Sequence, residues 1–346
     1  MASKTICLVT PIYPPDIGGP ATYTQALAKN LDTVKKVITF SQADSVVSIP
    51  KKLPLFRQLL LFLTVLTTKT GIVYSQDPLV TGLMSHLAAR LSGKQSLTKY
   101  VGDIAWERYQ DKGGQLSLED YLKKHPTSLR YLLSKFSLNL ANKIIVPSQY
   151  LKSILKTYYG LMGNKIIVIP NFVVKPKIKT QKQKNQIIFV GRHKPWKNLQ
   201  TLINAFNLVQ LKDWRLIIIG VPQPKRHRHS AIKFLGPLSH QKTFKLMTQS
   251  KILVLPSFYE GFPHVLLEAG TAGCAVIASD IPANKTLIKH RQTGLVFSPN
   301  KVEQLVSFLK QLTQKPKLRQ KLARNLAQKV KPYTLANHLK LLKQVL

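Results

Sequence analysis

The stretch KILVLPSFYEGFPHVLLEAGTAGCAVIAS, residues 251–279, decides how this chain folds. It begins with a short apolar run, Ile252 to Leu255, which ends at Pro256 and is typical of a buried strand. After a turn-rich loop, Pro263 is suited to the first turn of a helix, where no backbone N–H is needed. A second apolar run, Ala275 to Ala278, predicts the next strand. The stretch is therefore expected to form a strand, a loop, a helix and a strand.

Two carboxylates stand in this stretch, Glu260 in the loop and Glu268 in the helix. At the rise of an α-helix they would lie roughly 10 Å apart along one wall of a cleft. Between them lies a helix N-terminus, whose unpaired N–H groups and dipole attract an anion such as phosphate. This order of groups suits a molecule with hydroxyls at both ends and phosphates in the middle, as in a nucleotide sugar.

Length and composition indicate a globular protein with two domains. The chain has 346 residues, of which 44% are hydrophobic and 19% are charged, so it has enough apolar residues for packed cores. Its two cysteines, Cys7 and Cys274, provide no disulfide framework and no metal-ligand spacing, and a reduced compartment is expected. We predict no signal peptide, and the longest apolar stretch, Leu53–Leu66, is shorter than the roughly 20 residues of a membrane span.

The net charge of +38 is the unusual feature of the composition. Such a surface is attracted to anions: nucleic acid, anionic lipid headgroups or phosphorylated substrates. A general basic bias with no dedicated partner is the alternative. The second half of the chain, residues 174–346, holds five carboxylates, and Glu260 and Glu268 are two of them. General surface composition is therefore a poor explanation for this pair.

Apolar strand-like runs alternate with helical patterns along the whole chain, which predicts parallel sheets covered on both faces. We expect a first doubly wound, Rossmann-like domain over residues 1–173, a lysine-rich linker over 174–186, and a second such domain over 187–330. Residues 331–346 are expected to form a C-terminal helix, with packing against the first domain as one possibility for it.

Two loops at predicted strand ends carry candidate phosphate contacts. Gly18 and Gly19 precede the first helix, where a glycine permits close approach of a phosphate or a sugar. Arg192 and Lys197 follow the first strand of the second domain, IIFVG, and two cations at a strand's carboxyl end can neutralise a diphosphate leaving group. The alternatives are a plain strand-to-helix turn for the glycines and a solvated turn for the cations.

Taken in order, these segments resemble glycosyltransferase family 4, also described as glycosyl transferases group 1. The resemblance rests on PPDIGGPATYT, NKIIVIPNF, VGRHKPWKNL and PSFYEGFPHVLLEAGTAGCAVIAS, and it covers essentially the whole chain. The last motif is highly specific, whereas the glycine loop alone is not. The resemblance implies the GT-B fold, in which two Rossmann-like domains face each other across a cleft.

The resemblance also implies roles for individual residues. Glu260 would contact the hydroxyls of the transferred sugar, and Glu268 would hold the ribose hydroxyls. Arg192 and Lys197 would bind the diphosphate, which Gly18 and Gly19 would approach from the other domain. The remaining donor contacts implied are Gly261, Phe262, Pro263, His264 and, more loosely, Leu238 beside the nucleobase. No metal and no cofactor are expected, and no catalytic nucleophile is identified.

One stretch departs from the family pattern. Many members carry a histidine after a middle strand of the first domain, and the matching stretch here, KYVGDIAWERY at residues 99–109, has none. Asp103 is predicted to be catalytic instead, with Trp106 and Glu107 as acceptor contacts through ring stacking and hydrogen bonding. The alternative is a buried tryptophan beside a solvated aspartate and glutamate at a helix start. The other histidines are not expected to be functional, and His290 and His338 are expected at the surface.

The function implied is that of a retaining glycosyltransferase, moving a hexosyl-type sugar from a nucleotide-diphosphate sugar to a glycan or lipid-linked acceptor in envelope polysaccharide or glycolipid synthesis. A nucleotide-sugar epimerase of the same fold, a phosphorylase and a non-catalytic basic protein are the alternatives. Nucleic acid is not expected as a partner, because no known binding motif is present.

A cytoplasmic location is expected, with peripheral contact at the inner face of the membrane as a further possibility. For the helix over Leu53–Leu66, burial against the sheet is favoured over insertion into a membrane interface.

Overall fold

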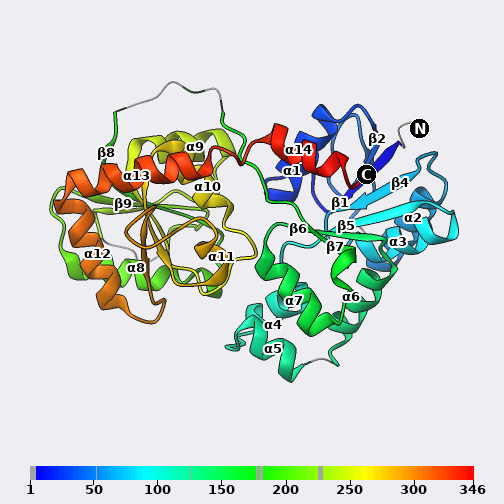
Figure 1. The fold of residues 1–346 in the computed structure, drawn as a ribbon, viewed down its shortest axis with the longest axis horizontal. Coiled ribbons are helices and arrows are strands. Elements are labelled where there is room, and N and C mark those ends of the chain that lie inside the picture. Colours follow the sequence, from blue (N-terminus) through cyan, green and yellow to red (C-terminus); the bar gives the residue numbers. More distant parts are fainter. Residues whose placement is uncertain (1–4, 52, 126, 177, 179–181, 225–228) are drawn as a thin grey trace. The chain divides into compact units, whose positions relative to one another are not determined.

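The structure is a computed structural model that describes residues 5–51, 53–125, 127–176, 178, 182–224 and 229–346. The chain forms two compact units, which Figure 1 shows as ribbons. The first comprises Met1–Tyr109, Leu118–Pro170 and Leu335–Leu346, and the second comprises Gln110–Ser117 and Asn171–Thr334. The C-terminal segment is thus part of the first unit.

The first unit is built on a parallel sheet of seven strands in the order β3-β2-β1-β4-β5-β6-β7. Its central strands β1, β4 and β5 are almost wholly buried because helices cover both of their faces. The strands are β1 (Ile6–Thr10), β2 (Val34–Thr39), β3 (Val47–Ser48), β4 (Ile72–Ser75), β5 (Gln95–Lys99), β6 (Lys143–Val146) and β7 (Ile166–Val168).

Helices alternate with these strands, as the sequence pattern predicted. They are α1 (Gly19–Asn30), α2 (Pro54–Leu66), α3 (Gly82–Leu91), α4 (Ile104–Asp111), α5 (Leu118–Lys124), α6 (Leu129–Leu140), α7 (Gln149–Tyr159), the short 3-10 helix η1 (Gly163–Lys165) and α14 (Leu335–Lys343). In one core cluster, Leu61 of α2 and Ala88 of α3 lie with Val73 of the sheet. The expected burial of the helix over Leu53–Leu66 holds for this inner side only, because its outer side is exposed.

Helix α14 is tied to α1 by a histidine that we expected at the surface. His338 is buried, and its Nε2 lies 2.8 Å from the Tyr23 hydroxyl, while its Nδ1 lies 2.7 Å from the carbonyl oxygen of Pro170. The prediction for His338 was wrong because it rested on a local basic sequence, whereas the contacts come from residues far away in the chain. Burial, followed by the nearby charge of Lys99, lowers the pKa of His338 to about 3.

The second unit repeats the plan with a parallel sheet of six strands in the order β10-β9-β8-β11-β12-β13. The strands are β8 (Lys184–Val190), β9 (Arg215–Ile219), β10 (Ile232–Phe234), β11 (Ser250–Leu255), β12 (Ala275–Ser279) and β13 (Leu295–Phe297). Strand β8 thus begins within the segment 174–186 that we expected to be a linker. The stretch 251–279, with which the sequence analysis began, forms the adjacent strands β11 and β12, and helix α10 connects them.

The helices of the second unit complete its layers. They are η2 (Pro195–Lys197), α8 (Leu199–Val209), α9 (His240–Gln249), α10 (His264–Ala272), α11 (Pro282–Lys285), α12 (Val302–Gln314) and α13 (Pro316–Val330). Helix α10 packs closely on α13, since a Cβ at Gly270 would lie only 2.9 Å from the Val330 side chain. It ends at Gly273, whose φ of 81° is the left-handed conformation that glycine adopts without strain.

Both cysteines lie in these cores as free thiols. Burial raises the pKa of Cys7 and of Cys274 to about 12, so neither is poised as a nucleophile. No helix in the described part of the chain has the length and apolar character needed to cross a membrane.

Candidate active site

The candidate site lies at the carboxyl edge of the second sheet. Strands β8 and β11 are parallel neighbours, so the loops that follow them, residues 191–198 and 256–263, lie at the same edge. The backbone N–H of Phe258 donates to the carbonyl of Trp196 over 2.7 Å and joins the two loops. The glycine at 220 permits the neighbouring strand end to approach, because a Cβ there would lie 2.5 Å from the Gly191 carbonyl oxygen.

Glu260 is held at this edge by two side chains. The Lys197 ammonium donates to its Oε1 over 2.6 Å, and the Ser257 hydroxyl donates to the same oxygen over 2.7 Å. The residue is 8% exposed. The other carboxylate oxygen, Oε2, takes part in neither of these two contacts. Lys197, which we predicted to bind the diphosphate, is therefore in direct contact with Glu260, which we predicted to bind the sugar.

Helix α10 begins beside Glu260. Its N-cap residue is Pro263, and no side chain caps the helix. The backbone N–H groups of His264 and Leu266 donate to the carbonyls of Phe262 and Pro263. Phe262 packs into the apolar core below, and Leu238 packs against the same core. The predicted donor contacts Gly261, Phe262, Pro263 and His264 thus form one continuous loop and helix start.

Glu268 lies further along α10 and has a partner that we did not predict. Its Oε1 lies 3.0 Å from Nε2 of His240, the first residue of α9. This hydrogen bond raises the pKa of His240, against the effect of burial. The side chain of Glu268 is only 11% exposed and that of His240 is 33% exposed.

Arg192 is exposed, and within the described ranges no ion pair to it is found. It follows β8 by two positions, on the same turn as Lys197. Of the three cations on this turn, Lys197 is thus paired with Glu260 and Lys194 with Asp111, whereas Arg192 stands open to an anionic ligand. An arginine in this state suits bidentate binding of a phosphate group.

Three residues of the site were missed by our reading of the sequence. His240, Ser257 and Asn198 all contact the two loops or Glu268, and Asn198 donates to the Pro256 carbonyl over 3.1 Å. Only Ser257 had a local signal, since it stands three residues before Glu260. His240 and Glu268 are 28 positions apart and meet through packing of α9 on α10.

The predicted glycine loop lies in the first unit. Gly18 has little room, because a Cβ there would lie 2.6 Å from the end of the Ile12 side chain, whereas a Cβ at Gly19 would meet nothing within 4 Å. Asp16 fixes the loop by accepting from the Ser41 hydroxyl over 2.6 Å. The surface at Gly19 is thus open where close approach to a ligand was predicted.

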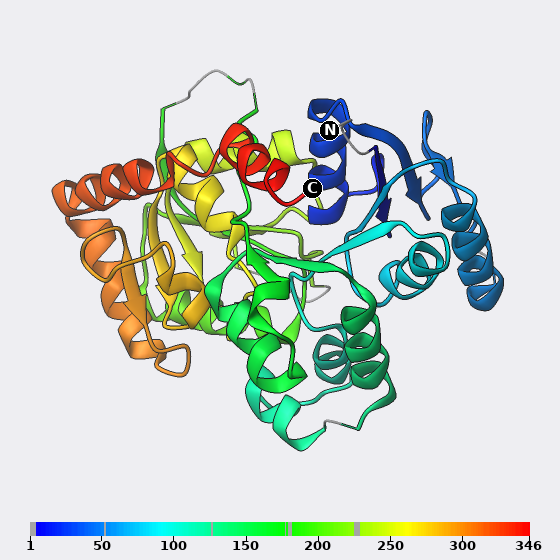
Figure 2. The same cartoon turned by 45° about the vertical axis from the view of Figure 1, so that its right-hand side comes forward.

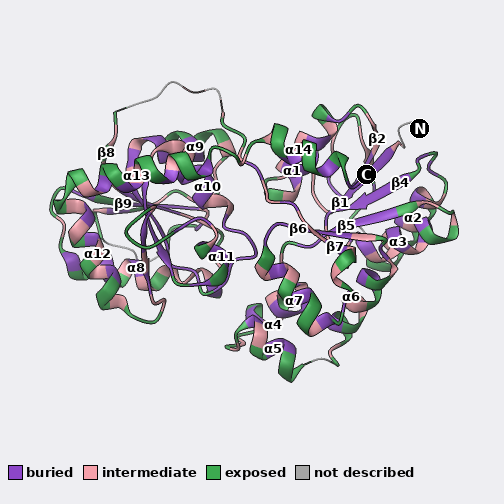
Figure 3. Cartoon of the chain, viewed as in Figure 1, coloured by how far each residue is buried: buried purple, intermediate pink, exposed green. Residues whose placement is uncertain are grey.

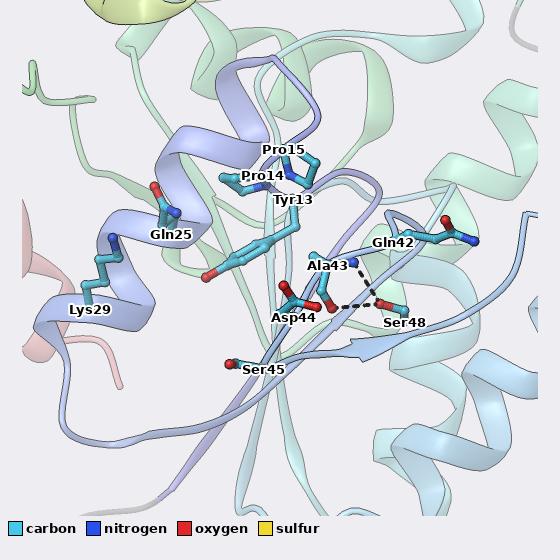
Figure 4. Close-up of a pocket in the computed structure, with 10 residues that line it drawn as sticks. All are labelled: Tyr13, Pro14, Pro15, Gln25, Lys29, Gln42, Ala43, Asp44, Ser45 and Ser48. Carbon is cyan, nitrogen blue, oxygen red and sulfur yellow. Dashed lines mark hydrogen bonds between the residues drawn. The ribbon is translucent and has the colours of Figure 1, made fainter.

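Beside this loop lies a pocket of about 720 Å³, which Figure 4 shows. Tyr13 and two prolines from the loop after β1 form one side, and Gln25 and Lys29 of α1 form another. The lining is completed by Gln42, Ala43, Asp44, Ser45 and Ser48. The mixture of an aromatic ring with amide, hydroxyl and charged groups is suited to a polar ligand such as a sugar.

Asp103 has a different environment from the two glutamates. It is 1% exposed and accepts hydrogen bonds from the hydroxyls of Tyr100 and Tyr159 and from the backbone N–H of Trp106. The alternative prediction, in which Asp103 is solvated at a helix start, was wrong, because these donors enclose the carboxylate at the start of α4. Its predicted catalytic role remains a prediction.

The two predicted acceptor contacts differ from each other. Trp106 is 2% exposed, which leaves no ring face open for the predicted stacking on a sugar. It fills the core beside α4 instead. Glu107 is partly exposed, and its contact with an acceptor remains a prediction. In the described part of the chain, no three His, Cys, Asp or Glu residues cluster as metal ligands would.

Comparison with known families gives two adjoining matches. The family described as Glycosyltransferase Family 4 matches residues 17–174, and the family described as Glycosyl transferases group 1 matches residues 172–329. Together the two matches span both units. They are the families that the motifs of the sequence resembled.

Curated relatives match over part of their length. An exopolysaccharide phosphotransferase of Streptomyces coelicolor is 30% identical over 183 residues, which is 49% of this chain and 19% of that protein. An uncharacterized glycosyltransferase of Haemophilus influenzae is 26% identical over 55% of this chain and 57% of its own. The O-antigen chain mannosyltransferase B of Escherichia coli is 26% identical over 41% and 40%. The chain thus spans from about a fifth to just over half of these relatives.

Solved structures match over the whole chain. Sucrose-phosphate synthase from Thermosynechococcus elongatus has a TM-score of 0.76 at 18% identity and covers 99% of this chain and 98% of its own. HepE of Anabaena, solved with UDP-glucose, has a TM-score of 0.76 at 15% identity and covers 99% of both. At these identities the likeness is one of fold. The expected GT-B class, with two parallel α/β units, is confirmed.

Proposed function

The chain belongs to glycosyltransferase family 4, and on this premise we propose that it is a retaining glycosyltransferase. It transfers a hexosyl-type sugar from a nucleotide-diphosphate sugar to a glycan or lipid-linked acceptor. The observation that carries the proposal is the carboxyl edge of the second sheet, where Glu260 contacts Lys197 shortly before α10 begins and Arg192 lies on the same turn as Lys197. A buried carboxylate, two cations and the positive end of a helix dipole match the parts of a nucleotide sugar.

The donor is held from its two ends. Glu260 accepts hydrogen bonds from the sugar hydroxyls through an oxygen that Lys197 and Ser257 leave open. Glu268 accepts from the ribose hydroxyls, and His240 fixes its orientation. Leu238 lines the side of the nucleobase. A carboxylate that already has one fixed partner loses little freedom on binding, which favours affinity.

Departure of the nucleotide diphosphate is driven by electrostatics. Charge develops on the phosphate oxygens as the bond to the sugar breaks, and groups fixed at that point stabilise it. Arg192 supplies a bidentate cation, Lys197 supplies a point charge held in place by Glu260, and the start of α10 adds its N–H groups. The leaving phosphate then takes the acceptor's proton on the same face of the sugar, which retains the anomeric configuration.

The acceptor is assigned to the first unit. The pocket beside Tyr13 and Lys29 has a polar lining, and Glu107 offers a further carboxylate. HepE is solved with UDP-glucose, and a further structural neighbour, WaaB, is described as a lipopolysaccharide outer core galactosyltransferase. The description of WaaB favours an acceptor in the cell envelope, and we propose the cytoplasmic face of the membrane as the place of action.

The test is transfer or hydrolysis with a panel of nucleotide sugars, with and without a chelator. We expect one or a few donors to release free nucleotide diphosphate, and the chelator to leave the rate unchanged because no metal is needed. Arg192→Ala should lower kcat by about two orders of magnitude. The matched control is Lys212→Ala, which removes one exposed cation at the start of β9, on the opposite edge of the same sheet.

Absence of both turnover and binding with every donor would refute the proposal. Interconversion of two nucleotide sugars without transfer would establish the epimerase alternative instead. An equal loss of activity in Arg192→Ala and Lys212→Ala would show that total charge, and not the position of Arg192, matters.

A further inference from the structure

Helix α2 presents large apolar side chains to solvent. Leu61 and Val65 face the sheet and are fully buried, as expected for a helix of a doubly wound unit. On the outer side, Leu55, Phe56, Leu59 and Leu63 are between 44% and 88% exposed. Helices at a protein surface usually carry polar residues on this side. Helix α2 is therefore apolar on both sides, and the sheet covers only one of them.

Helix α6 carries a second apolar stripe. Leu129, Leu132 and Phe136 follow a helical spacing and are between 47% and 71% exposed. Helix α3 packs against both α2 and α6, and Leu91 at its end is also exposed. Figure 1 shows the three helices in the first unit, and Figure 3 marks their exposed positions. We call the exposed apolar residues of α2, α3 and α6 the apolar face.

The charged residues on the three helices of the apolar face are all of one sign. Helices α2, α3 and α6 contain no Asp or Glu, while Arg90, Arg130 and Lys135 lie on α3 and α6. Arg57 of α2 is turned toward the core, where its guanidinium lies 4.7 Å from the centre of the Phe40 ring. The carboxylate that precedes α3, Asp77, is turned inward, where it accepts from the backbone N–H of Leu79 and from the Thr81 hydroxyl. The helices that carry the apolar face thus also carry cations whose charge no carboxylate of these helices offsets.

We infer that the apolar face docks the protein on an anionic phospholipid bilayer. Leucine and phenylalanine side chains enter the boundary between headgroups and acyl chains, and the surrounding Arg and Lys contact the lipid phosphates. A second copy of the chain fits less well, because a symmetric contact would bring these cations against one another. The inference adds a partner to the proposed function and does not depend on the identity of donor or acceptor.

The test is co-sedimentation of the full chain with vesicles of phosphatidylcholine alone and of phosphatidylcholine mixed with phosphatidylglycerol. We expect binding to the mixed vesicles, and we expect it to weaken as salt rises. The triple variant Leu55→Ser, Phe56→Ser, Leu59→Ser should bind at least about tenfold more weakly. The pair Leu132→Ser, Phe136→Ser should reduce binding independently, which shows that both helices take part.

The matched control is Leu208→Ser, which removes an exposed leucine of α8 in the second unit and should bind as the unaltered chain does. Circular dichroism verifies that each variant is folded, and donor hydrolysis in the absence of vesicles should be unchanged. Equal binding to both kinds of vesicle, or unweakened binding by the triple variant, would refute the inference. A variant that turns a dimer into a monomer in size-exclusion chromatography, with vesicle binding unchanged, would establish a second copy as the partner.

Discussion

The two units bury carboxylates in opposite ways. In the second unit, Glu260 and Glu268 are paired with groups that carry or can take a positive charge, Lys197 and His240. In the first unit, Asp103 is satisfied by two tyrosine hydroxyls and a backbone N–H, all of them neutral. Asp103 is also more completely enclosed, at 1% exposure against 8% for each glutamate.

The pKa values of buried and partly buried histidines also differ between the two units. His240 in the second unit has its pKa raised by its hydrogen bond to Glu268. In the first unit, burial lowers the pKa of His86 to about 4 and that of His338 to about 3. The second unit thus keeps charged groups near its surface, whereas the first unit keeps neutral groups inside its core. From this difference we infer ligand binding for the glutamates and a structural role for Asp103.

The largest expected effect is on catalysis at Glu260. Glu260→Gln keeps the size of the side chain but removes the charge that holds Lys197 and accepts from the sugar. We expect kcat to fall by about two to three orders of magnitude, with little change in the free energy of unfolding. Steady-state kinetics with the active donor and denaturant unfolding measure the two quantities. A wild-type kcat would remove Glu260 from the mechanism.

The next largest effect is on stability at Asp103. Asp103→Ala leaves buried hydroxyls of Tyr100 and Tyr159 without their acceptor, and we expect the free energy of unfolding to fall by about 3 kcal/mol. Asp103→Asn keeps part of these hydrogen bonds and should cost less. Where Asp103→Asn is folded, its kcat should stay within about tenfold of wild type. A fall by orders of magnitude in a folded variant would instead establish the catalytic role predicted from the sequence.

The strands and most helices of both units were predictable because doubly wound sheets have a strong local signal. A central strand such as β11 is apolar throughout, since both of its faces are covered, and prolines and glycines mark where it ends. The places of Glu260 in a loop and of Glu268 in the following helix were predictable as well, because Pro263 marks the helix start between them. Their roles in binding remain predictions.

Partners from distant parts of the chain were not predictable. His240 reaches Glu268 across 28 positions, and Tyr159 reaches Asp103 across 56. Such contacts depend on which helix packs on which, and no local pattern encodes that. The exposure of the outer side of α2 was missed for a related reason. An apolar helix has the same sequence pattern whether one side or both sides are covered.

A third prediction concerns acid stability and the buried histidine of α14. Below its ordinary pKa of 6.5, His338 takes up a proton in the unfolded chain but not in the folded one, so stability falls with pH until about 3. Between pH 7 and pH 5 the loss from this residue is about 2 kcal/mol. His338→Gln, which can keep both hydrogen bonds, should remove that part of the pH dependence in denaturant unfolding.

The control for that experiment is His193→Gln, the same substitution at an exposed position of the second unit. It should leave the pH dependence of unfolding as it is in the unaltered chain. An unchanged pH dependence in His338→Gln would mean that His338 takes up its proton at the same pH in the folded and the unfolded chain, which would contradict a pKa lowered by burial.

The smallest expected effect is on donor affinity at Glu268. Glu268→Gln replaces the carboxylate that we propose accepts from the ribose hydroxyls, so KM for the donor should rise about tenfold while kcat changes little. The substitution also removes the negatively charged hydrogen-bond partner that raises the pKa of His240. In the unaltered chain the pair is complete below the ordinary pKa of histidine and is lost as pH rises through the raised value, so an NMR titration of His240 should move to lower pH in the variant. Glu303→Gln, an exposed carboxylate on α12, is the matched control and should change neither quantity. If kcat fell with KM unchanged, Glu268 would act in the transition state, and the distinction between an anchoring and a catalytic glutamate would no longer hold.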